Sequence, residues 1–291
     1  MSSINDPVQV HEIGPGKLIA NRFEIRASHR QGGLSVAFEA FDREAGAERE
    51  VQFFPPSLFD GDQEAEEFAG LWAPWKRVES AHVLRVHEIA LVGPDALLLV
   101  TDLPKGRSLR TVLDEVERVP EAEVVRIGLQ LLEGLAALHA QGLVHGDVKP
   151  LSIWVGGSGR DLEDGVLIDG GSTPGLWTAK DLGERTALIG TPYYAPIEQF
   201  GGEAPDVQSD VYNLATLLFE LATGVQPWRG RTFLEVFQAK LEREPPTVAN
   251  RAPGVELSEA FENAVRGGLF PDREQRHSSA TAFHEALKAA L

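Results

Sequence analysis

The chain has 291 residues, 43% of them hydrophobic, which is enough apolar material for a substantial folded core and excludes a disordered chain. Its formal net charge of −17 argues against nucleic acid and anionic membranes as the main partners. The absence of cysteine excludes disulfides, thiolate metal sites and cysteine nucleophiles. The acidic surface serves solubility in the simplest interpretation. In the alternative it attracts a protein partner with a basic surface.

The first portion of the chain is predicted to be rich in β-strands. From Arg22 to Phe54, short apolar runs alternate with turn-like clusters, a pattern typical of antiparallel strands. Residues Asp62 to Val78 predict a helix that Pro74 kinks or ends. Two further strands are expected at Val83–His87 and Ala96–Asp102.

The second portion is predicted to be helical. A helix begins after Pro120, and a second apolar stripe from Val211 to Leu221 closes at Gly224. A third helix is expected around Phe261–Leu269, with a last helix to Leu291. No apolar run reaches the roughly 20 residues that span a bilayer, and the N-terminus lacks the layout of a signal peptide.

Four motifs in the second portion follow one another at informative spacing. They are His145–Pro150 with Leu167–Gly171 about twenty residues later, Gly190–Gln199, Ser209–Gly224 and Asp272–Arg276. In this order they resemble a bacterial serine/threonine protein kinase domain of the eukaryotic type, extending from about Phe23 to Leu291.

The resemblance implies an α+β, two-lobed protein-kinase-like fold. We expect a polar N-terminal tail over residues 1–17, a β-rich N-lobe with one main helix over 18–103, and a helical C-lobe over 104–291. By the same resemblance, Asp210 holds the catalytic loop through backbone hydrogen bonds, Glu198 and Arg276 form a buried ion pair, and His145 is a core residue.

The expected nucleotide site departs from the family pattern in the phosphate-covering loop. The family has G-x-G-x-x-G so that the backbone approaches the phosphates. Here the aligned segment runs from Arg30 to Ser35, and only Gly32, followed by Gly33, keeps the central glycine.

The strand after this loop also departs from the pattern. Gln52 stands where the family has a lysine, and an amide cannot neutralise phosphate charge. Glu50 shares a strand face with Gln52 and is expected to fill part of the adenine site. The alternative is a register shift that turns Glu50 to solvent. Leu71 aligns with the family's helix glutamate. Glu64, Glu66 and Glu67 lie about a turn or more upstream, and a shifted register would bring one of them to that position instead.

Part of the catalytic pattern is retained. Asp147, Lys149 and Asp169 keep the types that accept a hydroxyl proton, contact the γ-phosphate and hold Mg²⁺. Ser152 replaces the second metal ligand by a neutral hydroxyl, a poor ligand for Mg²⁺. Gly170 replaces a phenylalanine.

These departures lead to the hypothesis of a pseudokinase, a chain that is not an enzyme and works as a protein-binding scaffold or regulatory module. Asp147, Lys149 and Asp169 would then be vestigial, ATP and Mg²⁺ binding absent or weak, and no metal site present. The partner is expected to be a protein with a basic surface, without nucleic acid or membrane contact. The expected location is the cytoplasm, including the cytoplasmic part of a larger or membrane-anchored protein.

Two alternatives remain open. The first is a nucleotide or metabolite sensor that binds through the hinge residues Asp102 and Leu103 and the small gate residue Thr101. The second is a weakly active, atypical serine/threonine kinase in which Arg26, Arg30 or Lys17 replaces the missing lysine.

Overall fold

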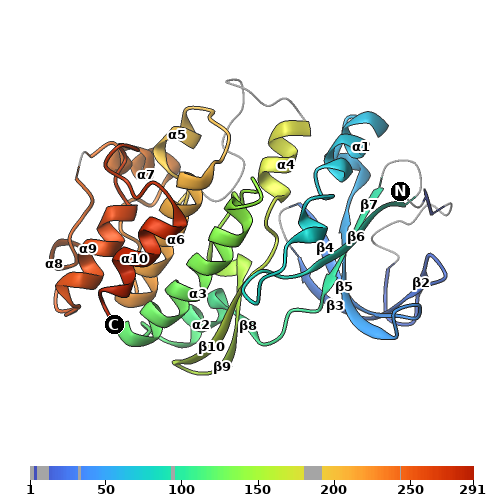
Figure 1. Ribbon diagram of the computed structural model, residues 1–291, viewed down its shortest axis with the longest axis horizontal. Coiled ribbons are helices and arrows are strands. Elements are labelled where there is room, and N and C mark those ends of the chain that lie inside the picture. The colour runs from blue at the N-terminus through green and yellow to red at the C-terminus, as the bar shows by residue number, and fades with distance from the viewer. Residues whose placement is uncertain (1–2, 5–12, 32–33, 93–95, 180–191, 243) are drawn as a thin grey trace. The chain divides into compact units, whose positions relative to one another are not determined.

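The computed structural model describes residues 3–4, 13–31, 34–92, 96–179, 192–242 and 244–291 (Figure 1). The chain divides into two compact units. The N-terminal unit comprises Met1–Glu79, Leu84–Pro104 and Thr178–Asp181. The C-terminal unit comprises Ser80–Val83, Lys105–Trp177 and Leu182–Leu291.

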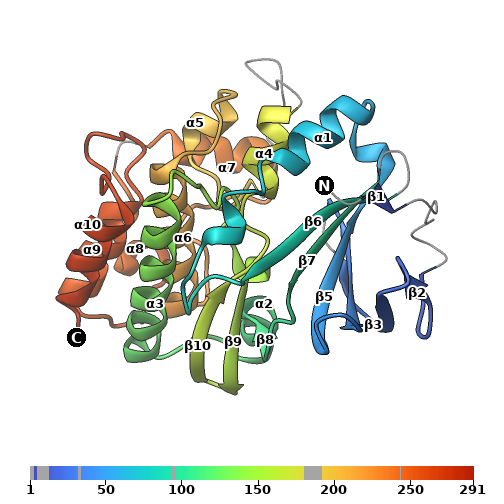
Figure 2. The ribbon, with the colours of Figure 1, turned by 45° about the vertical axis from the view of Figure 1, so that its right-hand side comes forward.

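The N-terminal unit is built on one seven-stranded sheet with the order β1-β6-β7-β5-β4-β3-β2 (Figure 2). Neighbouring strands are antiparallel, except that β1 pairs with β6 in parallel. The strands are β1 (Ser3–Ile4), β2 (Leu18–Ile19), β3 (Phe23–Gln31), β4 (Val36–Asp42), β5 (Ala47–Phe54), β6 (Val86–Val92) and β7 (Ala96–Asp102).

Strand β5 has two buried faces. Val51 and Phe53 belong to one apolar cluster with residues of β3, β4 and β7. Alternation places Glu50, Gln52 and Phe54 on the opposite face. There the Phe54 ring lies 5.1 Å from the ring of Phe68 in α1 (Asp62–Gly70). Two short 3₁₀ helices, η2 (Pro56–Leu58) and η3 (Trp75–Arg77), flank α1.

Two element boundaries differ from the sequence prediction. The helix expected over Asp62–Val78 ends at Gly70, and a 3₁₀ turn follows Pro74, because proline cannot continue the helical hydrogen bonding. The strand expected at Val83–His87 begins at Val86. Val83 belongs instead to the C-terminal unit, where it forms a bridge to Leu167, and the amide of Leu167 donates to the His82 carbonyl (2.9 Å).

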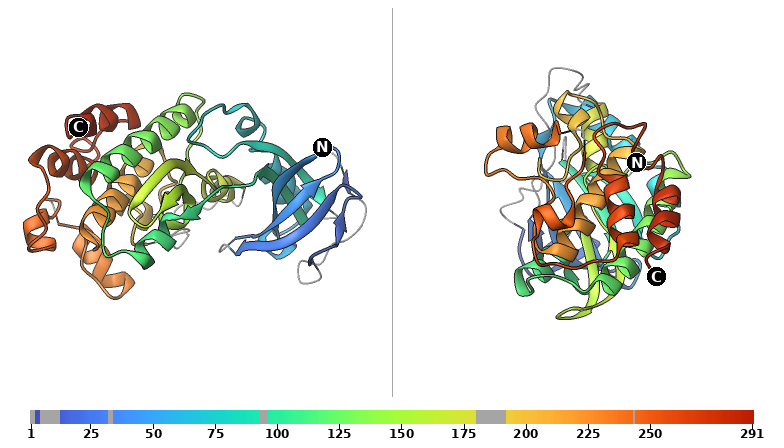
Figure 3. Two further views of the ribbon diagram at one scale, coloured as in Figure 1. Left: turned by 90° about the horizontal axis from the view of Figure 1, so that it is seen from below. Right: turned by 90° about the vertical axis from the view of Figure 1, so that its left-hand side faces the viewer.

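The C-terminal unit is organised around α3 (Glu121–His139) and α6 (Val207–Thr223) (Figure 3). Every residue of α6 from Ser209 to Thr223 is buried, as expected for a helix inside a bundle. Helices α3, α6, α9 and α10 pack on one another. The remaining helices are α2 (Leu109–Glu115), α4 (Ser172–Ala179), α5 (Ile197–Phe200), α7 (Phe233–Lys240), α8 (Val248–Arg251), α9 (Glu259–Gly268) and α10 (Ala280–Lys288).

A small three-stranded sheet with the order β10-β9-β8 completes the C-terminal unit. Its strands are β8 (Arg107–Ser108), β9 (Ile153–Ser158) and β10 (Asp161–Leu167), with the 3₁₀ turn η4 (Pro150–Ser152) just before β9. A β-rich unit with one main helix and a second, helical unit confirm the predicted α+β class. Across the part of the chain that the structure describes, no helix is long and apolar enough to cross a membrane.

Candidate active site

Asp210 fixes the loop that carries the candidate catalytic residues. Its carboxylate is fully buried in the first turn of α6 and accepts the backbone N–H groups of His145 (2.8 Å) and Gly146 (2.7 Å). The ring Nε2 of His139 lies 2.9 Å from the same carboxylate and donates to it. The backbone bonds were expected from the resemblance. The contribution of His139 was not foreseen, although its place in the last turn of a predicted helix was a usable signal.

His145 joins two loops. Its ring is buried, and its Nε2 lies 2.9 Å from the carbonyl oxygen of Ile168. The amide of Gly171 donates to the His145 carbonyl (2.9 Å), and the amide of Ile168 donates to the Ser152 carbonyl (2.9 Å). These bonds hold the loops of Asp147 and Asp169 together. Burial lowers the pKa of His145, so the ring is neutral and serves packing and positioning.

Asp147 and Lys149 form an ion pair on this loop, and their side chains are 21% and 23% exposed, so both remain reachable from solvent. The Ser152 hydroxyl is bonded within the loop. It lies 2.9 Å from the Asp147 carbonyl and 3.0 Å from the Lys149 carbonyl, and it accepts the Lys149 amide (2.9 Å). The hydroxyl therefore closes the turn and is not offered to a metal.

Backbone geometry explains two of the unusual residues. Gly146 has φ +80°, and a Cβ there would lie 2.5 Å from Cδ of Pro174. A side chain at this position would clash with Pro174. Asp169 has φ +61°, a conformation that is uncommon outside glycine and is concentrated at functional sites. Gly170 and Gly171 follow it and place no side chain in the loop.

In the N-terminal unit, Glu50 is buried with 0% of its side chain exposed. Its two carboxylate oxygens accept from Arg30 Nη2 (2.5 Å) and Nε (2.8 Å), and His29 Nδ1 lies 2.8 Å away. This arrangement excludes the alternative in which Glu50 faces solvent. Arg30 and His29 both come from β3 and were not predicted as partners, because strand register cannot be read from spacing alone.

Gln52 is also buried, and its amide donates to the Ser35 hydroxyl (2.6 Å). Gly32 and Gly33 lie outside the described residues. Leu71 is the C-cap residue of α1, directly after Gly70, and its alignment with the family glutamate stays a prediction.

The predicted gate and hinge residues lie at the end of β7. The Thr101 hydroxyl donates to the Asp102 carbonyl (3.0 Å) and is buried. The Asp102 carboxylate contacts Arg49 (3.0 Å) and His87 (2.8 Å), and Leu103 is partly exposed. These contacts hold Asp102 against its own sheet.

Arg276 and Glu198 meet as an ion pair in the C-terminal unit. The Arg276 guanidinium is fully buried, and its Nη1 lies 2.7 Å from Glu198, whose side chain is 7% exposed. Nearby, the buried ammonium of Lys240 donates to the carbonyls of Pro192, Tyr193 and Ala195 at 2.5–3.1 Å. Lys240 was not singled out from the sequence, since a lysine late in a predicted helix normally points to solvent.

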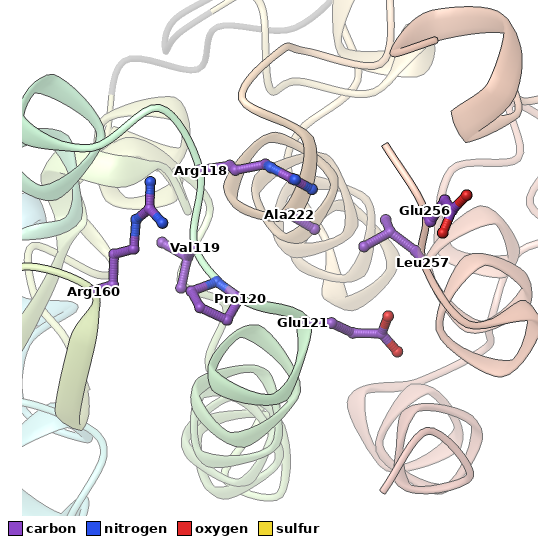
Figure 4. A pocket seen from close by; sticks show the side chains of 8 residues that line it. All are labelled: Arg118, Val119, Pro120, Glu121, Arg160, Ala222, Glu256 and Leu257. Atoms are coloured by element: carbon purple, nitrogen blue, oxygen red, sulfur yellow. The ribbon is translucent and has the colours of Figure 1, made fainter. Parts of the chain in front are cut away.

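A small cavity of about 220 Å³ lies at the start of α3 (Figure 4). Arg118 and Arg160 line it and are exposed, and the Glu121 carboxylate accepts from the amide (2.8 Å) and hydroxyl (2.5 Å) of Ser258. No predicted site residue lines this cavity. The candidate active site is instead the loop region that carries Asp147, Lys149 and Asp169, the residues with catalytic chemistry.

Comparison with known proteins establishes the class of this chain. The family model of the protein kinase domain matches residues 31–288. The chain therefore belongs to the protein kinase domain family. A crystal structure of the Mycobacterium tuberculosis PknI kinase domain (C20A mutant) has the same fold, with a TM-score of 0.72 at 18% identity, covering 96% of this chain and 98% of that one.

Among individual proteins, the chain is similar to bacterial serine/threonine-protein kinases. It is 30% identical to PknL of Mycobacterium tuberculosis over 94% of this chain and 66% of PknL. It is 26% identical to pkn3 of Myxococcus xanthus over 94% of this chain and 51% of pkn3. It is 38% identical to PkaB of Streptomyces coelicolor over 53% of this chain and 37% of PkaB. The chain thus spans only part of the length of these relatives.

These findings correct two predictions. The chain was expected not to be an enzyme, and ATP and Mg²⁺ binding was expected to be absent or weak. Both expectations are wrong, because the family is the protein kinase domain and the relatives are named as serine/threonine-protein kinases, a class that uses ATP with Mg²⁺.

The residues present fit ATP and Mg²⁺ with a reduced set of ligands. Asp147 and Asp169 supply carboxylates and Lys149 an ammonium group, the chemistry that a hard cation and a phosphate require. Among the described residues, no group of three potential metal ligands occurs. A magnesium ion would therefore be held by Asp169 together with phosphate oxygens and water.

Proposed function

We propose that this chain is an atypical serine/threonine protein kinase domain with slow turnover. The observation that carries the proposal is the Asp147–Lys149 pair, partly exposed on a loop that the buried Asp210 anchors through two backbone hydrogen bonds. A kinase needs a base for the acceptor hydroxyl and a cation for the transferred group, and this loop presents both.

Each residue has a stated role in the proposed reaction. ATP would donate its γ-phosphoryl group to the acceptor oxygen and leave as ADP, and Mg²⁺ would supply positive charge against the phosphates. The Asp147 carboxylate orients the acceptor hydroxyl of a protein serine or threonine and takes its proton. Lys149 would stabilise charge on the transferred group, and Asp169 would hold the metal. Asp210, His139 and His145 do not touch the reacting atoms and position the loop.

Slow turnover follows from the N-terminal unit. Gln52 brings no charge to the phosphates, and Arg30, the replacement cation, is held by the buried Glu50. Arg30 has to leave Glu50, which would keep its contact with His29, before the charge of Arg30 is available to a phosphate. We therefore expect turnover below the roughly 1–100 s⁻¹ that is typical of protein kinases.

The test is transfer of labelled phosphate from ATP to a mixture of serine- and threonine-containing peptides, for the whole chain and for Asp147→Asn. We expect slow incorporation on serine or threonine that is lost in Asp147→Asn while the melting temperature stays within a degree or two. No incorporation above that of Asp147→Asn, with either Mg²⁺ or Mn²⁺ and a folded protein, overturns the proposal.

A second, compatible role is that of a regulatory module that binds a protein partner. It is supported by the net charge of −17, which favours a partner with a basic surface and disfavours nucleic acid and anionic membranes. A cytoplasmic location fits this role. Capture of a partner that is released as salt increases would support it, and a partner retained equally at high salt would argue against charge steering.

A further inference from the structure

A pocket of about 640 Å³ lies in the C-terminal unit, away from the candidate active site. It is bordered by Pro227–Arg229 in the loop after α6, by Ala239 of α7, by residues 242 and 244–247, by Asn250 and Arg251 of α8, and by Arg266 of α9. Figure 1 labels these helices. Its lining includes Trp228 and three arginines, Arg229, Arg251 and Arg266.

Each arginine is held in place by a backbone carbonyl. Arg229 Nη2 donates to the Asn250 carbonyl (3.0 Å), and Arg251 Nε donates to the Gln226 carbonyl (2.6 Å). Arg266 donates to the Pro245 carbonyl through Nε (3.3 Å) and Nη2 (3.2 Å). These bonds use only some of the five N–H donors of each guanidinium, so the pocket wall carries positioned donors that remain available.

The charges of the three arginines are not balanced equally. Arg266 lies 3.8 Å from the Glu244 carboxylate. Within the described part of the chain, Arg229 and Arg251 form no ion pair. Burial and the neighbouring charge of Arg229 lower the pKa of Arg251. Two neighbouring cations are thus not paired with a carboxylate within the described part of the chain, although the net charge of the chain is −17.

We infer that this pocket is an anion-binding site that takes a dianionic phosphoryl group between Arg229 and Arg251. Two unpaired guanidinium groups match two negative charges, and the planar guanidinium binds phosphate oxygens in pairs. The binding of a phosphate relieves the repulsion between the two arginines. Glu242 and Glu244 also line the pocket and are exposed, as Arg229 is. Glu244 lies near Arg266 (3.8 Å), the arginine that the inference does not use.

The rest of the lining favours a phosphoryl group carried on a larger molecule. The pocket is several times larger than a phosphate ion, and Pro227, Pro245 and the buried Trp228 add apolar surface beside the arginines. A phosphorylated serine or threonine in a peptide has this combination of a dianion and an apolar body. Inorganic phosphate has the dianion but lacks the apolar body.

Binding is measured on the whole chain at pH 7.5 and constant ionic strength with three probes: inorganic phosphate, a short peptide with one phosphoserine, and the same peptide with serine. We expect the phosphoserine peptide to raise the melting temperature and to change tryptophan fluorescence, with saturation. The change in fluorescence should disappear in Trp228→Phe. The serine peptide should do neither.

Two matched variants locate the site. Arg229→Gln removes an exposed pocket arginine, and Arg231→Gln removes an exposed arginine two residues away that does not line the pocket. We expect Arg229→Gln to lower the affinity for the phosphoserine peptide about tenfold or more, as for loss of a charge-assisted hydrogen bond. We expect Arg231→Gln to leave this affinity unchanged. Equal affinities in both variants, or no binding of either phosphate probe to the wild type, overturn the inference. Binding of phosphate without the peptide keeps the anion site and assigns it to a free ion.

Discussion

The buried carboxylate of Glu50 determines the chemistry of its strand face. It has no exposure to solvent and depends on Arg30, with His29 also in contact. Removal of one partner of a buried pair leaves an uncompensated charge, whereas replacement of both by apolar residues is often neutral. The pair can therefore be dissected by a mutant cycle.

We predict that Arg30→Met lowers the free energy of unfolding by about 3–5 kcal/mol, and that the double variant Glu50→Met with Arg30→Met recovers most of this loss. Urea denaturation at pH 7.5 measures all the variants. Additive losses in the double variant would mean that Glu50 and Arg30 do not depend on each other.

A second buried pair offers an internal control. Arg276 and Arg273 both approach Glu198, at 2.7 Å and 3.3 Å, but Arg276 is fully buried whereas Arg273 is 35% exposed. We predict that Arg276→Ala costs about 3–5 kcal/mol of stability and Arg273→Ala about 1 kcal/mol or less. Thermal unfolding compares the two, and similar losses would contradict a burial-dependent role.

His145 predicts a pH dependence of stability. Its folded pKa lies below the ordinary value of 6.5 because the ring is buried. Below pH 6.5 the histidine of the unfolded chain binds a proton, whereas the buried ring of the folded chain stays neutral. The free energy of unfolding therefore falls as the pH decreases from about 7 towards 5. His277 shifts in the same direction and Glu220 in the opposite one, so the wild type alone is not diagnostic.

We therefore predict that His145→Asn reduces this slope by up to about 1.4 kcal/mol per pH unit. Denaturant titrations of the wild type and the variant between pH 5 and 7.5 measure the difference, in which His277 and Glu220 cancel. Parallel curves would show that His145 titrates normally in the folded chain.

Among single residues, the sequence predicted the contacts of those that lie inside a recognised motif. Asp210 and Arg276 are examples, because the motif of each one implies which residues it contacts. The sequence did not predict His29 as a partner of Glu50, or Lys240 as a donor to three carbonyls. These contacts depend on strand register and on which side of a helix is covered by a distant loop, and neither is encoded in local spacing.

At the scale of elements, α6 shows how a helix is terminated by the chain around it. Its end was expected from the Thr223-Gly224 signal, and Gly224 has φ +77°. A Cβ at Gly224 would lie 2.5 Å from the Glu117 carbonyl oxygen, so the position also needs space. Gly142 has a similar φ of +70° with nothing within 4 Å of an added Cβ.

We predict that Gly142→Ala costs about 1–2 kcal/mol, the usual penalty for a left-handed residue with a side chain, and that Gly224→Ala costs distinctly more because of the clash. Chemical denaturation of the two variants gives the difference. Equal costs would mean that the loop of Glu117 moves away freely.

Element types were easier to predict than their limits. The apolar periodicity identified α3 and α6, because a long helix repeats its pattern several times. The end of α1 at Gly70 and the start of β6 at Val86 were missed. Between them the chain crosses to the other unit at Ser80–Val83, where His82 and Val83 pair with Leu167. A tertiary contact of this kind leaves no periodic signal.

At the scale of the whole molecule, charge is the property most clearly set by sequence. The chain carries 44 acidic and 27 basic residues, and many of its arginines are already paired with carboxylates. The long-range field is therefore negative even though individual sites, such as the arginine-lined pocket, are positive. Fields of this kind act mainly on encounter rates and on partner choice.

This field leads to a prediction for the substrates of the proposed kinase. A peptide with lysines on both sides of the acceptor serine should bind more tightly than the same peptide with glutamates, because the chain attracts the first and repels the second. The preference should shrink as ionic strength rises from about 50 to 300 mM, since the screening length falls from roughly 14 to 6 Å. Fluorescence anisotropy with labelled peptides on Asp147→Asn measures binding without turnover. Equal affinities at low salt, or a preference that does not change with salt, would show that short-range contacts and not the overall charge select the partner.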